Sequence, residues 1–197
     1  MNNWLLAYDT FDPAAERLRE ALCTLGNGYF AVRGAACETQ ADDIHYPGTY
    51  LAGGYNRLKT DISGHIVENE DLVNMPNGLL LKFKIEDGDW FKISETEILA
   101  YRQELDIRLG ILTRSVRFRD KQKRETTFTC RRIVSMKEMH VAAQEIVIVP
   151  ENCVQTYDMS IELAKEVGAF AHPGDLMHVF FLYHMALNGV EVIKAIE

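Results

Sequence analysis

The strongest constraint on the fold is a run of short strand-like segments, separated by turns, that fills most of the chain after Leu72. The segments are rich in β-branched and aromatic residues and are joined by polar or glycine-containing connections. They are residues 79–85, 98–107, 112–118, 125–134, 141–149 and 154–161. Parallel strands need long crossover connections, usually helices, and these connections are too short for that. The pattern therefore predicts an all-β fold of antiparallel sheets in a β-sandwich or barrel.

The part of the chain before these segments is expected to begin with a short helix and a turn. Asp12 can cap a helix, Pro13 suits its first position, and residues 14–22 favour helix by propensity. Asn27 and Gly28 tolerate positive φ, so this dipeptide predicts a tight turn in front of a strand. A phosphate-binding loop is the weaker reading of these glycines, because such a loop follows a strand and opens a helix.

The last 35 residues differ in pattern from the rest of the chain, so we expect two parts: residues 1–162, the sandwich, and residues 163–197, a divergent tail. In the tail, Asp175 can cap a helix, and residues 176–187 are apolar on all sides of such a helix. This run is too short to span a bilayer, so we expect a C-terminal helix that is buried or forms an interface.

Charge and composition narrow the classes of partner. The formal net charge of −8 argues against nucleic acid and against an anionic membrane surface, since both require clustered Lys and Arg. The first residues lack the basic region and the long apolar run of a signal peptide, so the cytoplasm is the expected location.

No metal or other cofactor is expected from the local patterns. The four cysteines, Cys23, Cys37, Cys130 and Cys153, form no C-x-x-C pair and have no histidine at zinc-site spacing, so buried thiols are the simpler interpretation. His172, His178 and His184 recur at intervals of six, which would place them on different faces of a helix.

Paired carboxylates are what glycoside cleavage requires, and the chain has two acidic clusters, residues 68–71 and 86–89. Both clusters are more simply explained as turns, because acidic residues crowd solvent-exposed loops. No self-sufficient catalytic constellation is present in the sequence.

Several blocks in order resemble the N-terminal domain of glycoside hydrolase family 65, which includes the maltose, trehalose and kojibiose phosphorylases. The blocks begin at Glu20, Pro47, Leu72, Tyr101 and Arg132, and the resemblance covers residues 3–161. Structural or interdomain roles are expected for the motif residues Asn27, Gly28, Arg33, Gly34, Glu38, Gly48, Thr49, Tyr50, Asn74, Pro76, Asn77 and Asp106.

The resemblance implies a large, supersandwich-like antiparallel β-sandwich that precedes a barrel of helices. In the family, the barrel carries the general-acid glutamate and the phosphate-binding residues, and members cleave α-linked glucose disaccharides with inversion. No position in this sequence matches those residues. Because the match ends near Ile161, the sandwich is expected to be incomplete.

The sequence analysis leads to a non-catalytic domain or fragment of a disaccharide phosphorylase as the first functional hypothesis. A stand-alone carbohydrate-binding module and a small active glycoside hydrolase are the alternatives. The expected partners are a catalytic helical-barrel domain, an α-glucoside, and a second copy of the chain bound through the tail or an open sheet edge. In such a dimer, or in a tail folded back on its own sheet, Phe180, Phe181 and Leu182 are expected to be buried.

Overall fold

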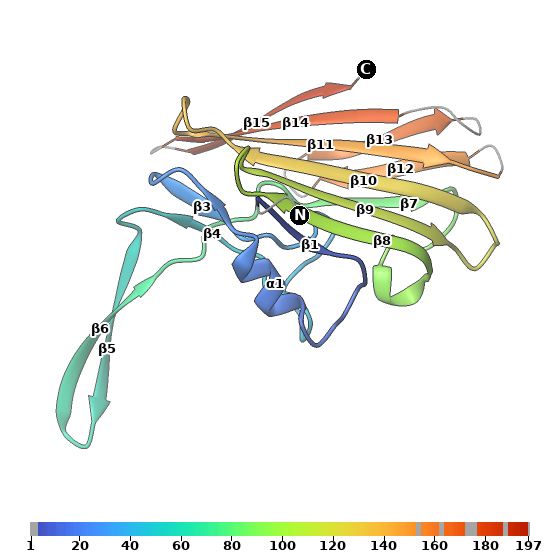
Figure 1. Cartoon of the computed structure of the whole chain (residues 1–197). Helices are drawn as coiled ribbons and strands as arrows, with labels where there is room; N and C mark the ends of the chain where they lie inside the picture. Colours follow the sequence, from blue (N-terminus) through green and yellow to red (C-terminus); the bar gives the residue numbers. More distant parts are fainter. Residues whose placement is uncertain (1–3, 153–154, 162–163, 172–176, 187–188, 197) are drawn as a thin grey trace.

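The computed structural model describes residues 4–152, 155–161, 164–171, 177–186 and 189–196, and beyond residue 152 it describes the backbone alone. Two layers of antiparallel strands dominate the chain (Figure 1). One layer is a seven-stranded sheet in the order β1-β8-β9-β10-β11-β14-β15. Its strands are β1 (Leu5–Tyr8), β8 (Glu97–Asp106), β9 (Ile111–Arg119), β10 (Glu125–Val134), β11 (Val141–Pro150), β14 (Met177–Ala186) and β15 (Gly189–Ile196).

The second layer is a three-stranded sheet in the order β13-β12-β7, formed by β7 (Leu81–Ile85), β12 (Gln155–Ile161) and β13 (Ala164–Ala171). A small sheet of β2 (Leu25–Gly26), β3 (Phe30–Val32) and β4 (Thr49–Leu51) lies near α1 (Glu16–Leu22), the one α-helix among the described residues. The strands β5 (Tyr55–Ile62) and β6 (His65–Leu72) pair with each other and form a two-stranded arm that projects from the body. A one-turn 3₁₀-helix, Ile93–Glu95, precedes β8.

The main core lies between β7 and the seven-stranded sheet. Along β9, β10 and β11 every second residue is buried, which is the period expected of strands with one covered face. Phe128 lies opposite Val116 on one neighbouring strand and Ile148 on the other. Its ring centroid is 4.9 Å from that of Phe83 on β7. The alternation visible in the sequence therefore becomes the inner face of the sandwich.

A second buried cluster lies between the small sheet and the seven-stranded sheet. Its members come from the residue after α1, from β2 and β3, from the turn before β7, and from β8 to β11: Cys23, Leu25, Phe30, Val32, Leu79, Leu105, Leu112, Val134 and Ala142. This cluster attaches the first 35 residues to the sandwich and so fixes the loop that follows β3.

The predicted all-β sandwich with a short N-terminal helix is confirmed. The helix begins at Glu16, and Asp12 lies in the preceding turn, where its Oδ1 accepts a hydrogen bond from Ala14 N. Residues 86–89 form the predicted turn, after which Phe91 N donates to Phe83 O. Gly28 has the positive φ expected of the Asn-Gly turn, at 85°.

The predicted helix at residues 176–187 is wrong. Residues 177–186 form β14, which pairs with β11 from Val141↔His184 to Ile148↔Met177 and with β15 on its other side. An apolar run of this length fits either a buried helix or a buried strand, and the open edge of β11 decides in favour of the strand. The burial predicted for Phe180, Phe181 and Leu182 concerns side chains outside the described part of the structure.

One further expectation is corrected. Residues 68–71 belong to β6 rather than to a turn, since each pairs with a residue of β5. Strands also occur beyond Ile161, where β13, β14 and β15 add to the two sheets. No helix among the residues that the structure describes is long and apolar enough to cross a membrane.

Candidate functional site

The motif residues gather around the loop between β3 and β4, residues 33–48. At its start, Arg33 Nε donates to Tyr46 O at 2.7 Å, and one terminal nitrogen of Arg33 donates to Arg17 O at 2.9 Å. The guanidinium also lies 3.9 Å from the carboxylate of Glu20. Arg33 therefore ties α1 to the far end of the loop.

Glu20 is the buried centre of this arrangement. Its Oε1 lies 2.9 Å from His45 Nδ1, and its Oε2 accepts a hydrogen bond from Tyr46 N at 2.8 Å. Since both oxygens have partners inside the protein, Glu20 holds the loop rather than presenting a free acid.

Three glycines permit close packing or unusual backbone at the motif. A Cβ on Gly34 would come within 2.5 Å of Cys23 Cβ, and one on Gly48 within 2.6 Å of the Tyr50 hydroxyl. Gly28 differs, because a Cβ there would meet nothing within 4 Å, so only its positive φ constrains that position. Burial raises the pKa of both the Cys23 thiol and the Tyr50 hydroxyl above their ordinary values.

Glu38 forms a buried ion pair with Arg114 of β9, with the closest nitrogen and oxygen 2.8 Å apart. Burial alone opposes the charged form of Arg114, but the carboxylate of Glu38, helped by Tyr101, outweighs it and raises the pKa of the guanidinium above its ordinary value. An ion pair of this kind fixes the loop to the inner face of the seven-stranded sheet.

The Asn74 side-chain amide joins the segment that follows the arm to the motif loop. Its Oδ1 accepts a hydrogen bond from Thr49 N at 3.0 Å, and its Nδ2 donates to Pro47 O at 3.1 Å. Asn77 Oδ1 accepts from Leu79 N in the next turn, with Pro76 between the two asparagines. The amides thus set the path of the chain from the arm to β7.

The remaining motif residues lie apart from the loop. Asn27 Oδ1 accepts from the amides of Tyr29 and Phe30, while its Nδ2 donates to Ser135 O and Met139 O in the connection between β10 and β11. Asp106 Oδ1 accepts from Leu109 N in the turn between β8 and β9.

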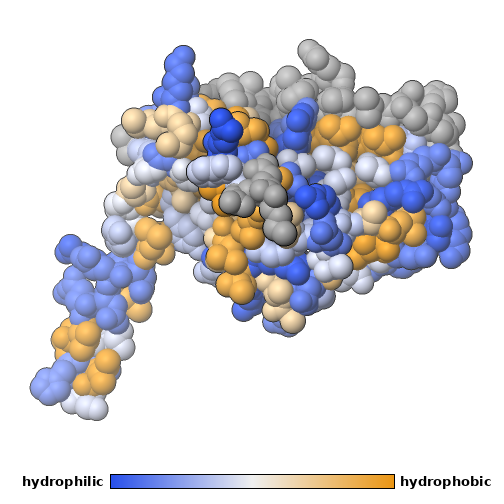
Figure 2. Space-filling model, viewed as in Figure 1, coloured by the Kyte–Doolittle hydropathy of each residue, from blue (hydrophilic) through white to orange (hydrophobic). Residues whose placement is uncertain are grey.

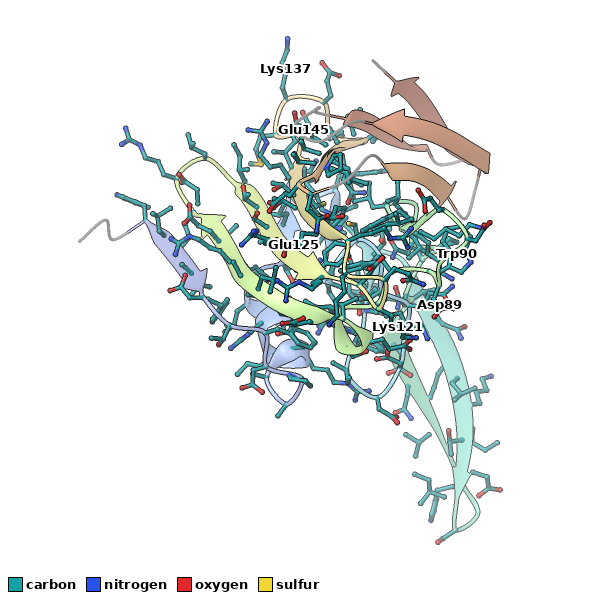
Figure 3. The ribbon with its side chains drawn as sticks, turned by 90° about the vertical axis from the view of Figure 1, so that its right-hand side faces the viewer. Asp89, Trp90, Lys121, Glu125, Lys137 and Glu145 are labelled. Carbon is teal, nitrogen blue, oxygen red and sulfur yellow. The ribbon has the colours of Figure 1, made fainter. Side chains whose placement is uncertain are left out.

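Two hollows flank residues 39–41 of the loop. The first has a volume of about 310 Å³, and its walls include Gln40, Asp42, Lys82 and Trp90. The second, of about 410 Å³, lies toward Asn74, Pro76 and Asn77. Figure 3 shows Trp90 beside Asp89 and Lys121, whose side chains form an ion pair with a nitrogen-to-oxygen distance of 2.9 Å. The motif loop therefore separates two hollows, each large enough for a small ligand.

The first hollow contains two carboxylates, Glu38 and Asp42. Glu38 is engaged by Arg114, and Asp42 Oδ1 accepts hydrogen bonds from the amides of Ile44 and His45. Both carboxylates therefore have partners inside the protein, an arginine for Glu38 and two backbone amides for Asp42. In the part of the chain that the structure describes, no group of histidine, cysteine and acidic side chains is arranged to hold a metal ion.

The structure brings together nine of the predicted motif residues: Arg33, Gly34, Glu38, Gly48, Thr49, Tyr50, Asn74, Pro76 and Asn77. Sequence reasoning missed the buried polar residues that receive the loop on the sheet, namely Gln103, Arg114, Arg132 and Gln144. Each occupies an inward-facing position of an alternating strand, and a polar residue at such a position is the signal that could have revealed them.

Comparison with known proteins agrees with this description. The profile of Glycosyl hydrolase family 65, N-terminal domain, matches residues 6–168. An uncharacterized glycosyl hydrolase of Mycobacterium tuberculosis is 49% identical over 155 residues, which are 79% of this chain and 12% of that protein. The trehalose 6-phosphate phosphorylase of Lactococcus lactis is 44% identical over 88 residues, 44% of this chain and 11% of the enzyme.

The kojibiose phosphorylase of Halothermothrix orenii is 28% identical over 150 residues, 76% of this chain and 18% of the enzyme. A solved structure from the human microbiome, assigned as a kojibiose phosphorylase, matches with a TM-score of 0.74 at 15% identity. It covers 98% of this chain, which spans 30% of that protein. This likeness concerns the fold alone, and the chain spans less than a fifth of the length of each of the three sequence relatives.

Proposed function

Because the chain belongs to glycosyl hydrolase family 65 through its N-terminal domain, we propose that it serves as a non-catalytic β-sandwich domain of an inverting phosphorylase of α-linked glucose disaccharides. The phosphorylases among its relatives support the reaction class. The buried ion pair that Glu38 forms with Arg114, and the two backbone amides that Asp42 accepts from, suit structural roles for the two acids of the adjoining hollow and support a non-catalytic role.

The arm formed by β5 and β6 is the observation that carries the proposal. Its cross-strand register places Arg57 opposite Glu70 and Lys59 opposite Glu68 on one face, where ion pairs join them. The other face, termed the apolar face below, carries the apolar residues Leu58, Ile62 and Val67 together with the polar residues Asn56, Thr60, His65, Asn69 and Asp71. Leu58 and Ile62 are 57% and 56% exposed, and Figure 2 shows apolar patches along the projecting arm.

A two-stranded ribbon with one uncovered apolar face is marginally stable in water by itself. The relatives extend several-fold beyond the region they share with this chain. The occupant that we assign to the apolar face is therefore the catalytic helical barrel of the phosphorylase. In this arrangement the sandwich positions the arm, and the apolar face of the arm packs against the catalytic barrel.

The test mixes the purified chain with the catalytic part of its Mycobacterium tuberculosis relative, produced without its N-terminal domain. We expect a complex by light scattering that the double variant Leu58→Asp/Ile62→Asp loses. The matched control Arg57→Ser/Lys59→Ser changes the charged face of the same arm and should keep binding. Equal binding by both variants would contradict the role assigned to the arm.

Carbohydrate binding is a second candidate function, favoured by the hollow beside Trp90. Sugars are bound by an aromatic face together with planar hydrogen-bonding side chains. The hollow offers an indole, the Gln40 amide and the Asp42 carboxylate, and Lys82 Nζ donates to Gln40 Oε1 at 3.0 Å. The chain has two tryptophans, and Trp4 is exposed elsewhere on the surface.

Titration with maltose, trehalose and kojibiose tests this second function. A Trp4→Phe variant leaves Trp90 as the only fluorescent tryptophan, and saturable quenching that Trp90→Phe abolishes is the expected result. Calorimetry measures disaccharide binding without a fluorescent tryptophan. Applied to the Trp90→Ala and Trp4→Ala variants, it distinguishes loss of the binding site from loss of the fluorescence signal. Binding that survives in Trp90→Ala would exclude this hollow.

A further inference from the structure

A third, much smaller hollow lies between the motif loop and the inner face of the seven-stranded sheet. Its volume is about 10 Å³, and its walls include Cys37, Gln103, Arg114, Cys130 and Arg132. Such a volume holds about one water-sized particle. None of the proposed functions uses this hollow.

The Gln103 side chain presents an unused donor in this region. Its Oε1 accepts a hydrogen bond from the Tyr101 hydroxyl at 2.9 Å, whereas its buried Nε2 has no hydrogen-bond partner among the described residues. A buried N–H without an acceptor costs free energy comparable to a lost hydrogen bond. The amide therefore favours an acceptor in the hollow.

The Arg132 guanidinium supplies a positive charge without a carboxylate partner in the described part of the chain. Its nitrogens donate to Gln144 Oε1 at 2.9 and 3.1 Å and to the carbonyl oxygens of Arg33 and Ala35 at 3.2 Å. All of these acceptors are neutral. By contrast, Arg114 on the next strand has the carboxylate of Glu38.

The neighbouring carboxylates are already committed to other cations. Glu16 pairs with Arg19, and Glu20 is shared by His45 and Arg33. The buried and half-buried charges under the loop thus comprise four arginines, Arg19, Arg33, Arg114 and Arg132, and three glutamates, Glu16, Glu20 and Glu38. Arg132 is the one of these four arginines that has no carboxylate partner among the described residues, and burial makes an uncompensated charge costly.

We propose that the hollow binds a single monatomic anion of the halide class. An anion would accept a hydrogen bond from Gln103 Nε2 and compensate the excess charge of Arg132, whereas a water molecule could do only the first. The bound anion would hold residues 34–37 against the sheet and so stabilise the loop that separates the two larger hollows.

The direct test is a crystal of the full chain grown in sodium bromide. The proposal expects an anomalous bromide peak in the hollow, in contact with Gln103 Nε2 and a guanidinium. A water molecule there, without anomalous signal, would overturn it.

Thermal melts provide a second, independent readout. Bromide should raise Tm saturably by about 3 °C relative to gluconate at equal ionic strength, because an anion that binds the folded state stabilises it. The variants Gln103→Leu and Arg132→Gln should lose this dependence of Tm on bromide.

The control Arg131→Gln, at an exposed position of β10 that pairs with Glu145, should retain the dependence of Tm on bromide. If Arg132→Gln does not fold, Gln103→Leu and the bromide crystal decide the result, and an undiminished halide response in Gln103→Leu would contradict the site.

Discussion

At the scale of single residues, the motif positions hold the backbone in place. Gly28 is the clearest case, since its φ is 85° and a side chain there would touch nothing. A β-branched residue is strained in this region, so Gly28→Val should lower the free energy of unfolding by about 2 kcal/mol. Urea unfolding measures this change. Gly28→Asn is the matched control and should lose less, because asparagine adopts positive φ more readily. An unchanged midpoint for the valine variant would show that backbone strain is unimportant at this turn.

A larger loss of stability is expected when the ion pair between Glu38 and Arg114 is broken. Glu38→Gln keeps the shape of the side chain but leaves the buried Arg114 without its anion. Removing one partner of a buried pair costs about 3–5 kcal/mol. The matched control is Glu95→Gln, which breaks the exposed pair with Lys92 and should cost less than about 1 kcal/mol. Similar losses in the two variants would mean that the loop is not fastened through Glu38.

At the scale of elements, local pattern predicted the strands that carry regular alternation, such as those at residues 125–134 and 141–149, and the turn at residues 86–89. Local pattern failed to predict the secondary structure of segments that are strands only because a neighbouring strand pairs with them. The run at residues 177–186 is a strand because β11 and β15 flank it, and this neighbourhood is invisible in the local sequence. Acidic β6 is a strand because it pairs with basic β5.

The same limit applies to the site. The glycines and asparagines of the motif are typical of tight turns, so they could be identified from the sequence. The role of Glu20 as a buried centre could not be predicted, because its partners His45 and Tyr46 lie 25 and 26 residues further along the chain. The hollow beside Trp90 likewise depends on β7 and the motif loop meeting in space.

The arm can be tested as an element. Its strands pair only with each other, so replacing residues 56–71 by a short Gly-Ser turn between Tyr55 and Leu72 should change the stability of the sandwich by less than about 0.5 kcal/mol. Thermal melts check the stability, and binding to the catalytic part should be lost. A large drop in Tm would show that the arm belongs to the folding unit of the sandwich.

At the scale of the whole molecule, the described strands beyond residue 163 extend both layers. Deleting residues 163–197 removes β13, β14 and β15 and leaves an open edge on β11 and on β12. Exposed edges favour association, so we expect aggregation or a large loss of stability in light scattering and thermal melts. For the intact chain we expect a homodimer through an open sheet edge, seen in the same light-scattering experiment. A soluble, monomeric and equally stable fragment of residues 1–162 would contradict the structural role of the tail.

The central claim is that this chain supports a phosphorylase without performing the reaction. Its most direct test is the incubation of the homogeneous chain with maltose, trehalose or kojibiose, with and without phosphate, while glucose and glucose 1-phosphate are measured. We predict neither product, because inversion needs a general acid on one side of the glycosidic bond and phosphate on the other, and the two acids at the loop, Glu38 and Asp42, are held by Arg114 and by backbone amides. Reproducible release of either product, retained through repeated purification, would contradict the claim and make the chain an enzyme in its own right.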